Sequence, residues 1–372
     1  MKPGFILTLS LYLGFFFNHT CSAQAYKTSF GIEIIEDFSR VIDGGITSGE
    51  TLMGFIALSH ETSLWSGASL KGQHVLNHGK PLTDYVGDLQ TISNIEAPRN
   101  FYLYEFNLEQ RFKGHTLIVG KSEINALFAY NTHGLGFVHS SFGIGPEMSV
   151  NVPLATFPYA AMGIYTNLQI QKNLHLSAAV YDGRPNTEIG YIKSYDFSLN
   201  SKRGFFWIGE IDYQITKEKT QISTYKMGIW SLQGITQKES GFYAIIDQKL
   251  LTEDEDSTQG LHAFAQYGRI PNNATVFKNY SGMGMVYYGP LSNRSQDQIG
   301  LAWGQGNLSD TYQNNLSRTS DRAETVIEAY YNYVISDQLE VQLDSQYIVN
   351  PGVDPLVKNA LVGILRLKYN LF

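Results

Sequence analysis

Polar and apolar residues alternate along most of the chain, whereas the spacing of apolar residues typical of helices is scarce. The polar face of segment 103–112 holds charges of both signs, and its apolar face ends in an aromatic residue near a turn. These features predict a transmembrane β-strand, polar toward an aqueous lumen and apolar toward lipid. One face carries Glu105, Asn107, Glu109 and Arg111, and the other carries Tyr104, Phe106, Leu108 and Phe112.

The same alternation recurs near the C-terminus. The polar positions there are Glu340, Gln342, Asp344 and Gln346 in one segment, and Arg366, Lys368 and Asn370 in the next. Apolar or small residues occupy the positions between them, so both segments are predicted to line the same lumen.

Alternation and turn residues together predict about sixteen strands, an even number, as bacterial barrels have. The fold class is therefore expected to be all-β: an antiparallel up-and-down transmembrane barrel with an inward-folded constriction loop. The predicted strands cover 30–41, 51–59, 68–74, 100–112, 115–121, 156–168, 174–181, 204–216, 219–230, 240–249, 259–269, 282–289, 296–304, 323–334, 338–348 and 360–371.

The lengths of the connections support this strand order. If the N-terminus is periplasmic, the short connections fall on the periplasmic side and the long ones outside. The longest connection follows the fifth strand, where barrels of this size fold a loop inward. Two connections, 60–67 and 250–257, are long for periplasmic turns. The short connections are 113–114, 169–173, 216–220 and 335–338, and the long ones are 75–99, 122–155, 182–203 and 305–322.

Residues 1–25 have the pattern of a cleaved secretory signal. Lys2 precedes an apolar run, and small residues allow cleavage after Ala23 or, as we favour, after Ala25. The apolar run is shorter than the ~20 residues of a spanning helix, and no later stretch approaches that length. The only cysteine, Cys21, lies in this segment. The mature chain, 26–372, is therefore expected to form a single barrel without disulfides.

Composition agrees with a barrel. Only 16% of residues are charged, against about 25% in soluble domains, and 35 Gly, 24 Tyr and 21 Phe suit tight turns and an aromatic girdle. Removing the signal takes away one base, Lys2, and no acid, so 27 bases and 34 acids become 26 and 34, a net charge of −8. This balance argues against a nucleic-acid partner.

Catalytic and metal-binding signatures are missing from the sequence. There is no Gly-x-Ser-x-Gly elbow, phosphate-binding loop or His-Glu-x-x-His motif. We therefore predict neither an enzyme nor a cofactor nor a metal site. The acidic run 253–256 fits either a divalent-cation site or a solvated turn, and the turn is the favoured interpretation.

Candidate pore-lining or substrate-binding residues follow from parity and position. The predicted inward loop also contains Asn125, Phe128, Tyr130, His133 and His139. Such a mixture suits a sugar, which has hydroxyl edges and an apolar C–H face, and it also suits any folded loop. The candidates are Glu105, Asn107, Glu109, Arg111, Lys121, Glu123, Asp247, Gln248, Glu328, Gln342, Asp344, Gln346 and Arg366.

Several short motifs, in order along nearly the whole mature chain, resemble those of the OprB-type carbohydrate-selective porins. Each is weak alone, and together they are specific. They are Val86–Ile95, Tyr104-Glu105, Glu109-Gln110, Val119-Gly120-Lys121, Ser140–Gly143, Tyr181-Asp182-Gly183, Gly241-Phe242-Tyr243, Asp247-Gln248, Glu324–Tyr331 and Gln346–Gly352.

The resemblance implies a sixteen-stranded porin, integral to the Gram-negative outer membrane, through which small mono- and disaccharides diffuse passively past charged pairs and aromatic residues. Its implied partners are sugars, outer-membrane lipid and lipopolysaccharide, and a homotrimer is one assembly open to it. The chain departs from the family in the stretch 342–345, in its shortness, and in Phe372, which falls out of phase with Tyr369 and Leu371.

Three alternatives keep different parts of this interpretation. A general or anion-selective porin would have the same fold and pass other solutes, but the sequence shows no run of lumen Lys or Arg. A structural protein or adhesin would have the same barrel with its pore plugged. A soluble secreted β-protein would share only the strands.

Overall fold

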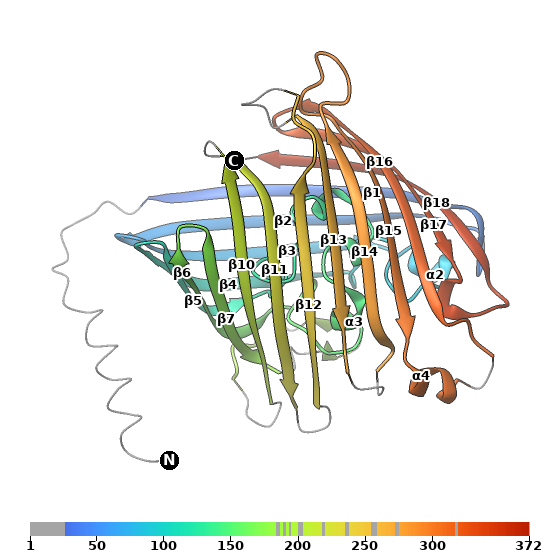
Figure 1. The fold of residues 1–372 in the computed structure, drawn as a ribbon, viewed down its shortest axis with the longest axis horizontal. Coiled ribbons are helices and arrows are strands. Elements are labelled where there is room, and N and C mark those ends of the chain that lie inside the picture. Colours follow the sequence, from blue (N-terminus) through green and yellow to red (C-terminus); the bar gives the residue numbers. More distant parts are fainter. Residues whose placement is uncertain are drawn as a thin grey trace.

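The chain forms a closed antiparallel barrel. The computed structural model describes residues 27–183, 187–188, 191–192, 195–199, 204–217, 220–234, 238–253, 259–271, 275–316 and 319–371. Sixteen strands follow one another around the wall, and β1 (Thr28–Gly45) closes the ring by pairing with β18 (Lys358–Leu371). The strands are tilted, so those of the near and far walls cross in projection (Figure 1). The predicted fold class and strand number are confirmed.

The other wall strands are β2 (Glu50–Trp65), β3 (Ala68–Gly79), β4 (Asn100–Phe112), β5 (His115–Ser122), β6 (Ala161–Gln171), β7 (Leu174–Asp182), β10 (Phe205–Lys217), β11 (Thr220–Gln233), β12 (Lys238–Lys249), β13 (Gly260–Arg269), β14 (Phe277–Tyr288), β15 (Gln298–Leu308), β16 (Ala323–Ser336) and β17 (Leu339–Val349). Two short strands, β8 (Thr187–Glu188) and β9 (Tyr191–Ile192), pair outside the wall.

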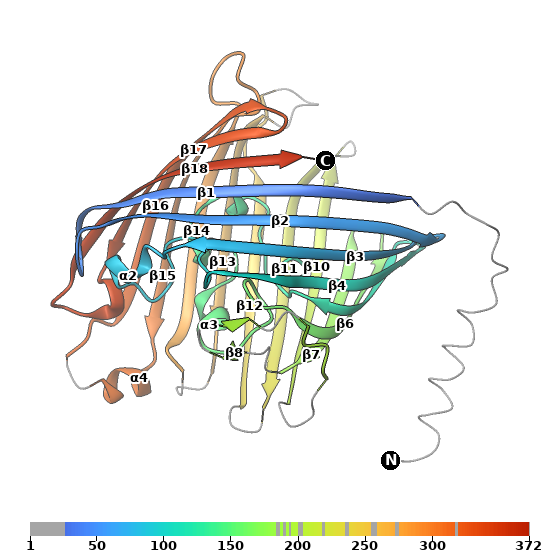
Figure 2. The ribbon, with the colours of Figure 1, turned by 180° about the vertical axis from the view of Figure 1, so that it is seen from behind.

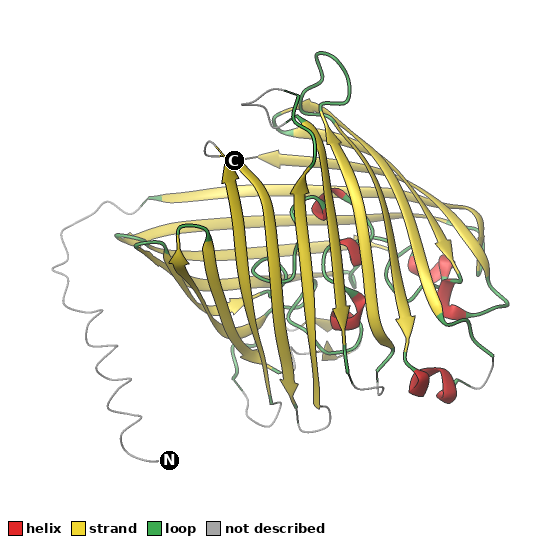
Figure 3. Cartoon of the chain, in the orientation of Figure 1, coloured by secondary structure: helices red, strands yellow, loops and turns green. Residues whose placement is uncertain are grey.

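Short helices lie in the connections, and Figure 3 shows them in red against the yellow wall. None of the described helices is long and apolar enough to cross a membrane. They are α2 (Thr83–Val86), η1 (Gly134–Gly136), η2 (Ser140–Phe142), α3 (Pro146–Ser149), α4 (Asp310–Asn315) and η4 (Pro351–Val353).

Long connections gather at one end of the barrel, as predicted. The end that holds the start of β1 and the end of β18 has the short turns, including 66–67, 113–114 and 172–173. The opposite end has the long loops, of which 123–160, after β5, is the longest. Figure 2 shows β1 to β4 running side by side between the two ends. In the usual sense of bacterial barrels, the short-turn end is periplasmic.

Some strand boundaries differ from the predicted ones. β2 continues to Trp65, so only Ser66 and Gly67 remain as a turn. β6 begins at Ala161 rather than 156, because the segment before it contains Pro158, which has no N–H for the ladder. The predicted signal, residues 1–25, together with Phe372 and the acids at 254–256, lies outside the described residues.

A β-bulge changes the face of one aromatic residue. β3 pairs Gln73 with Glu105 and His74 with Leu103, so Tyr104 has no residue opposite it. Tyr104 is 5% exposed, and its hydroxyl bonds to Glu123 inside the barrel. Alternation predicted an outward Tyr104, and the extra residue of the bulge turns it inward beside Glu105.

The outer face is apolar and flanked by aromatic residues. Exposed residues in mid-wall include Ile229, Met283 and Leu301. Exposed aromatics mark the strand ends nearest the short turns (Trp65, Phe112, Tyr213, Tyr333) and those nearest the long loops (Phe101, Trp207, Phe242). This pattern is that of a lipid-facing wall with two interfacial girdles.

The inner face carries more apolar residues than strict polar-in alternation predicts. Phe137 and Phe142 of loop 123–160 pack into one buried cluster with Phe264 and Tyr330 of the wall. Inward glycines make this close packing possible: a Cβ on Gly304 would lie 2.6 Å from the Tyr280 hydroxyl. The apolar inner residues therefore form a core between the wall and its inward loop.

Candidate functional site

Loop 123–160 folds into the lumen, where carboxylates of the wall bind its backbone. Asp247 of β12 accepts hydrogen bonds from the N–H groups of Thr132 (2.9 Å) and His133 (3.4 Å). Glu210 of β10 accepts another from Ala129, at 3.1 Å. A loop with no strand neighbour must satisfy its buried N–H groups elsewhere, and inward carboxylates are strong acceptors.

Glu328 of β16 binds the same loop through both of its carboxylate oxygens. Its two carboxylate oxygens take hydrogen bonds from the N–H groups of Val138 (2.6 Å) and His139 (3.1 Å). On β17, Gln342 donates to the carbonyl of Gly136 at 3.0 Å. The stretch 136–139 is thus fixed against the wall by side chains from two adjacent strands.

The shorter loop 80–99 is held in the same way. Glu324 of β16 accepts hydrogen bonds from the N–H groups of Leu89 (3.0 Å) and Gln90 (3.1 Å), and Gln346 of β17 donates to the carbonyl of Ile92 at 3.1 Å. The two loops also bind each other, since Ser141 donates to the Gln90 side chain at 3.0 Å. Together they narrow the lumen.

The seam of the barrel contains a buried ion pair. Arg366 of β18 donates to both carboxylate oxygens of Asp37 on β1, at 2.6 and 2.7 Å, and a further N–H donates to Ser93 of loop 80–99 at 3.0 Å. Both side chains are almost fully buried. Asp344 lies beside this pair and beside Glu328. Arg366 therefore connects β18 to β1 across the seam and also connects β18 to loop 80–99.

A second polar cluster lies at the start of loop 123–160. Glu105 accepts a hydrogen bond from the N–H of Glu123 at 2.8 Å, while the Glu123 carboxylate accepts one from Tyr104 and another from the N–H of Phe157 at 3.2 Å. Asn107 lies one inward position further along β4 and is buried. Burial raises the pKa of Glu123.

A third group faces the more open part of the lumen. Glu109 of β4 binds Lys71 of β3 at 2.7 Å and also contacts Arg111. The Lys71 and Arg111 side chains are 31% and 68% exposed, whereas that of Glu109 is 7% exposed. Of the predicted residues, Glu109 and Arg111 thus belong to a cluster that meets solvent, with Arg111 at the short-turn rim.

Two predicted pore-lining residues do not face the lumen. Lys121 pairs with Phe106 and Met162 in the register, on the parity of the outer face, where Asp196 interacts with it electrostatically. Gln248 shares the outer parity of Ile246 and bonds to the Tyr225 hydroxyl. Neighbouring residues of a strand point to opposite faces, so Asp247 and Gln248 cannot both line the pore.

Several important residues were not among the predicted ones. Asp37, Lys71, Glu210 and Glu324 all stand at inward positions of their strands. For Lys71 the sequence held enough information. Lys71 lies within the predicted strand 68–74, and the alternation of polar and apolar residues in β3 places its side chain inward. For Glu210 and Glu324 the alternation predicts that the side chain points into the barrel. The loop that each residue binds can be identified only from the structure.

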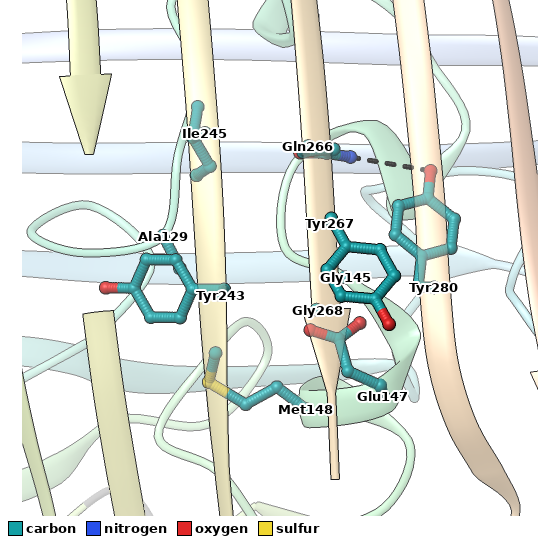
Figure 4. Close-up of a pocket in the computed structure, with 10 residues that line it drawn as sticks. All are labelled: Ala129, Gly145, Glu147, Met148, Tyr243, Ile245, Gln266, Tyr267, Gly268 and Tyr280. Atoms are coloured by element: carbon teal, nitrogen blue, oxygen red, sulfur yellow. Dashed lines mark hydrogen bonds between the residues drawn. The ribbon is translucent and has the colours of Figure 1, made fainter. Parts of the chain in front are cut away.

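Glu147 of α3 is buried where the loop docks on β13. Its carboxylate lies against Gly268, where a Cβ would come within 1.7 Å of the Oε1 atom, and Oε2 has no hydrogen-bond partner. The adjoining cavity, lined also by Tyr243, Gln266 and Tyr280, is small (Figure 4). Burial raises the pKa of Glu147 to about 8. The carboxyl group is therefore neutral at pH 7.

We expect the docking of α3 to weaken in alkali. An exposed Glu loses its proton near pH 4.5, whereas the docked Glu147 loses it near pH 8. The free energy that favours docking is therefore largest below pH 4.5 and decreases as the pH rises from 4.5 to 8. Hydrogen exchange of residues 145–150, corrected for intrinsic rates, should be faster at pH 9.5 than at pH 6.

Glu147→Gln should remove this difference, because the amide does not titrate, and the exposed Asp310→Asn should keep it. Equal corrected exchange at both pH values in the wild type would contradict the assignment.

Within the described ranges, no cluster of three or more His, Cys, Asp or Glu residues is placed to hold a metal ion. The arrangement consists of two docked loops, buried carboxylates that bind them, and a partly open charged cluster. It can restrict the passage of solutes.

A sixteen-stranded barrel with an apolar outer face and inward loops has the architecture of outer-membrane channels. Residues 61–371 match the family model described as carbohydrate-selective porin, OprB family. The chain belongs to this family, and it is an integral protein of the Gram-negative outer membrane.

Similarity to individual proteins agrees with the family. Over 144 residues the chain is 30% identical to Porin B of Pseudomonas aeruginosa, a match covering 34% of this chain and 32% of that protein. The match thus spans about a third of that relative's length.

The fold is similar to that of solved channels. A high-pH structure of OprB from Pseudomonas putida aligns with a TM-score of 0.82 at 17% identity, covering 92% of this chain and 94% of that one. DcaP, an outer-membrane channel of Acinetobacter baumannii, aligns with a TM-score of 0.58 at 11% identity, covering 95% and 99%.

Proposed function

We propose that this protein allows passive, carbohydrate-selective diffusion of small sugars, mono- and disaccharides, across the outer membrane. The observation that carries the proposal is the pair of loops, 80–99 and 123–160, held inside the lumen by Glu324, Asp247 and Glu328. A lumen that is narrowed and still polar selects by size and by polar contacts. Membership of the carbohydrate-selective family supports sugars as the solute.

The charges of the open cluster favour neutral polar solutes. Glu109 stands between Lys71 and Arg111, so donors and acceptors of both signs face the lumen together. A hydroxyl group can donate to the carboxylate and accept from either cation. We propose Glu109 and Arg111 as solute-facing residues, whereas Glu105, Asp247, Glu328, Gln342, Gln346 and Arg366 act by positioning the loops and the seam.

Other parts of the proposal follow from the fold and the family. Diffusion needs no energy source and no cofactor, and the protein is proposed to be a channel and not an enzyme. Its partners would be sugars and the surrounding lipid and lipopolysaccharide, with no nucleic acid. We further propose that residues 1–25 are removed on export and that residues 26–372 form one barrel. A homotrimer is one assembly that this barrel could form.

Conductance in planar bilayers tests the proposal against a plugged structural barrel. The purified protein should produce discrete conductance steps, and glucose added to both sides should lower the ion current reversibly because the sugar occupies the narrow part. An absence of steps would support the plugged structural or adhesin barrel and overturn the channel.

We expect Glu109→Gln to shift the pore toward anions. The substitution leaves the charges of Lys71 and Arg111 without their counter-charge. One unit charge ~4 Å away changes the energy of a passing ion by about 1 kcal/mol in water, a roughly fivefold change in relative permeability. The reversal potential in a KCl gradient should move accordingly. Glu36→Gln, on the outer face, should leave it unchanged, and an unmoved potential in Glu109→Gln would place Glu109 outside the solute path.

A further inference from the structure

Two histidines meet where the tip of loop 123–160 reaches the wall. The Nε2 atom of His133, from the loop, lies 3.2 Å from the Nδ1 atom of His262 on β13, and the ring centroids are 4.4 Å apart. His133 is half-buried and His262 is 9% exposed. β13 begins at the short-turn end, so the pair lies toward that end of the lumen.

Both sides of the pair are held in place. The Tyr288 hydroxyl on β14 bonds to the other nitrogen of His133, Nδ1, at 3.1 Å, and the Tyr288 ring contacts the His262 ring with centroids 4.9 Å apart. Asp247 fixes the loop by accepting the N–H of His133. Lys249 stands opposite His262 in the register.

The two nitrogens are within hydrogen-bond distance of each other, and the same spacing fits two ligands on one ion. Imidazole nitrogens bind Zn²⁺ at about 2.0–2.1 Å in tetrahedral geometry, which puts two such nitrogens roughly 3.4 Å apart. A metal-binding histidine is usually oriented by a hydrogen bond at its second ring nitrogen. Tyr288 provides that bond for His133.

We propose that His133 and His262 form a binding site for a divalent transition-metal ion such as Zn²⁺, with water from the lumen completing the coordination. The two ligands come from different elements, so the bound ion joins the tip of the constriction loop to the wall. Loop docking and metal binding are then linked, and each strengthens the other. The proposal is independent of which solute the channel passes.

Isothermal titration calorimetry on the folded protein in detergent, prepared without a histidine tag, tests the site. Zn²⁺ should bind saturably with one ion per chain, and His133→Asn or His262→Asn should each weaken binding at least tenfold, because one of two protein ligands is lost. His74→Gln removes a histidine that stacks on Phe101 at the outer face and should leave the affinity unchanged. Mg²⁺, which prefers oxygen ligands, should give no binding at equal concentration.

Two results would overturn the proposal: no saturable Zn²⁺ binding by the wild type, or unchanged affinity in both the His133 and the His262 variants. The heat-modifiable migration of the barrel on gels confirms that each variant is folded. Because no sugar is present, failure here would leave the proposed sugar diffusion untouched, and failure of sugar diffusion would leave the metal site untouched.

Discussion

Replacing Arg366 with methionine is expected to lower the free energy of unfolding of the barrel by about 3–5 kcal/mol. Arg366 and Asp37 form a two-point ion pair across the β1–β18 seam, and both side chains are almost fully buried. Methionine keeps much of the side-chain volume but leaves the Asp37 carboxylate buried without its counter-charge. Ser93 of loop 80–99 loses a donor as well.

Denaturant unfolding of the protein refolded into lipid vesicles measures this effect. Asp37→Asn should cost much less in the Arg366→Met background than in the wild type, because the two residues act as one unit. Arg40→Met, at an exposed position of β1, should change stability by no more than about 0.5 kcal/mol. Independent, additive effects of the Asp37 and Arg366 substitutions would contradict the role of the pair.

Replacing Glu328 with alanine is expected to release loop 123–160 from the wall and raise the single-channel conductance. The Glu328 carboxylate is 0% exposed and binds the N–H groups of Val138 and His139. A buried N–H group left without its hydrogen-bond partner costs about 1–3 kcal/mol, so losing two acceptors removes a large part of what holds this stretch of the loop. An undocked loop leaves the lumen closer to the open channel of a sixteen-stranded barrel.

Planar-bilayer recording measures the change. Glu340→Ala is a matched control, since Glu340 is also an acid of the neighbouring strand but bonds to Asn332 of the wall and not to a loop. It should keep the wild-type conductance. A Glu328→Ala channel with wild-type conductance and unchanged sensitivity of residues 134–142 to protease would show that other contacts suffice to hold the loop.

The sequence was enough to predict the barrel because its physics is local. A strand with one face in lipid and one in water must alternate, and turn length follows from which side of the membrane a hairpin reaches. Segments such as 339–347 show both signals without interruption. The longest loop, 123–160, was placed correctly after β5 for the same reason.

The candidate site was less accessible from the sequence because it depends on contacts between distant segments. Glu328 and Val138 are separated by 190 positions, and nothing near either residue marks the other. Alternation identified Glu328 as inward, but an inward carboxylate can face solute or bind a loop. The structure assigns Glu328 and Asp247 to loop binding, whereas Glu109 is left with two partly exposed cations beside it.

Local irregularities explain the remaining differences. The bulge at Tyr104 adds one residue to β4, which turns an aromatic ring inward that strict alternation points to lipid. Lys121 follows Gly120, and the continuous register of β5 keeps the lysine on the outer parity despite its position next to the loop. Tyr104 lies within β4, where only the bulge breaks the alternation, whereas Lys121 lies near the end of β5, where alternation is least informative.

The most direct test of carbohydrate selectivity is liposome swelling with a series of sugars and amino acids matched in size. Wild-type protein should admit glucose faster than a neutral amino acid of similar size and faster than disaccharides, and Glu328→Ala should reduce these differences because the loop no longer narrows the lumen. Equal rates for sugars and size-matched amino acids through the wild-type channel would contradict carbohydrate selectivity and leave a general porin.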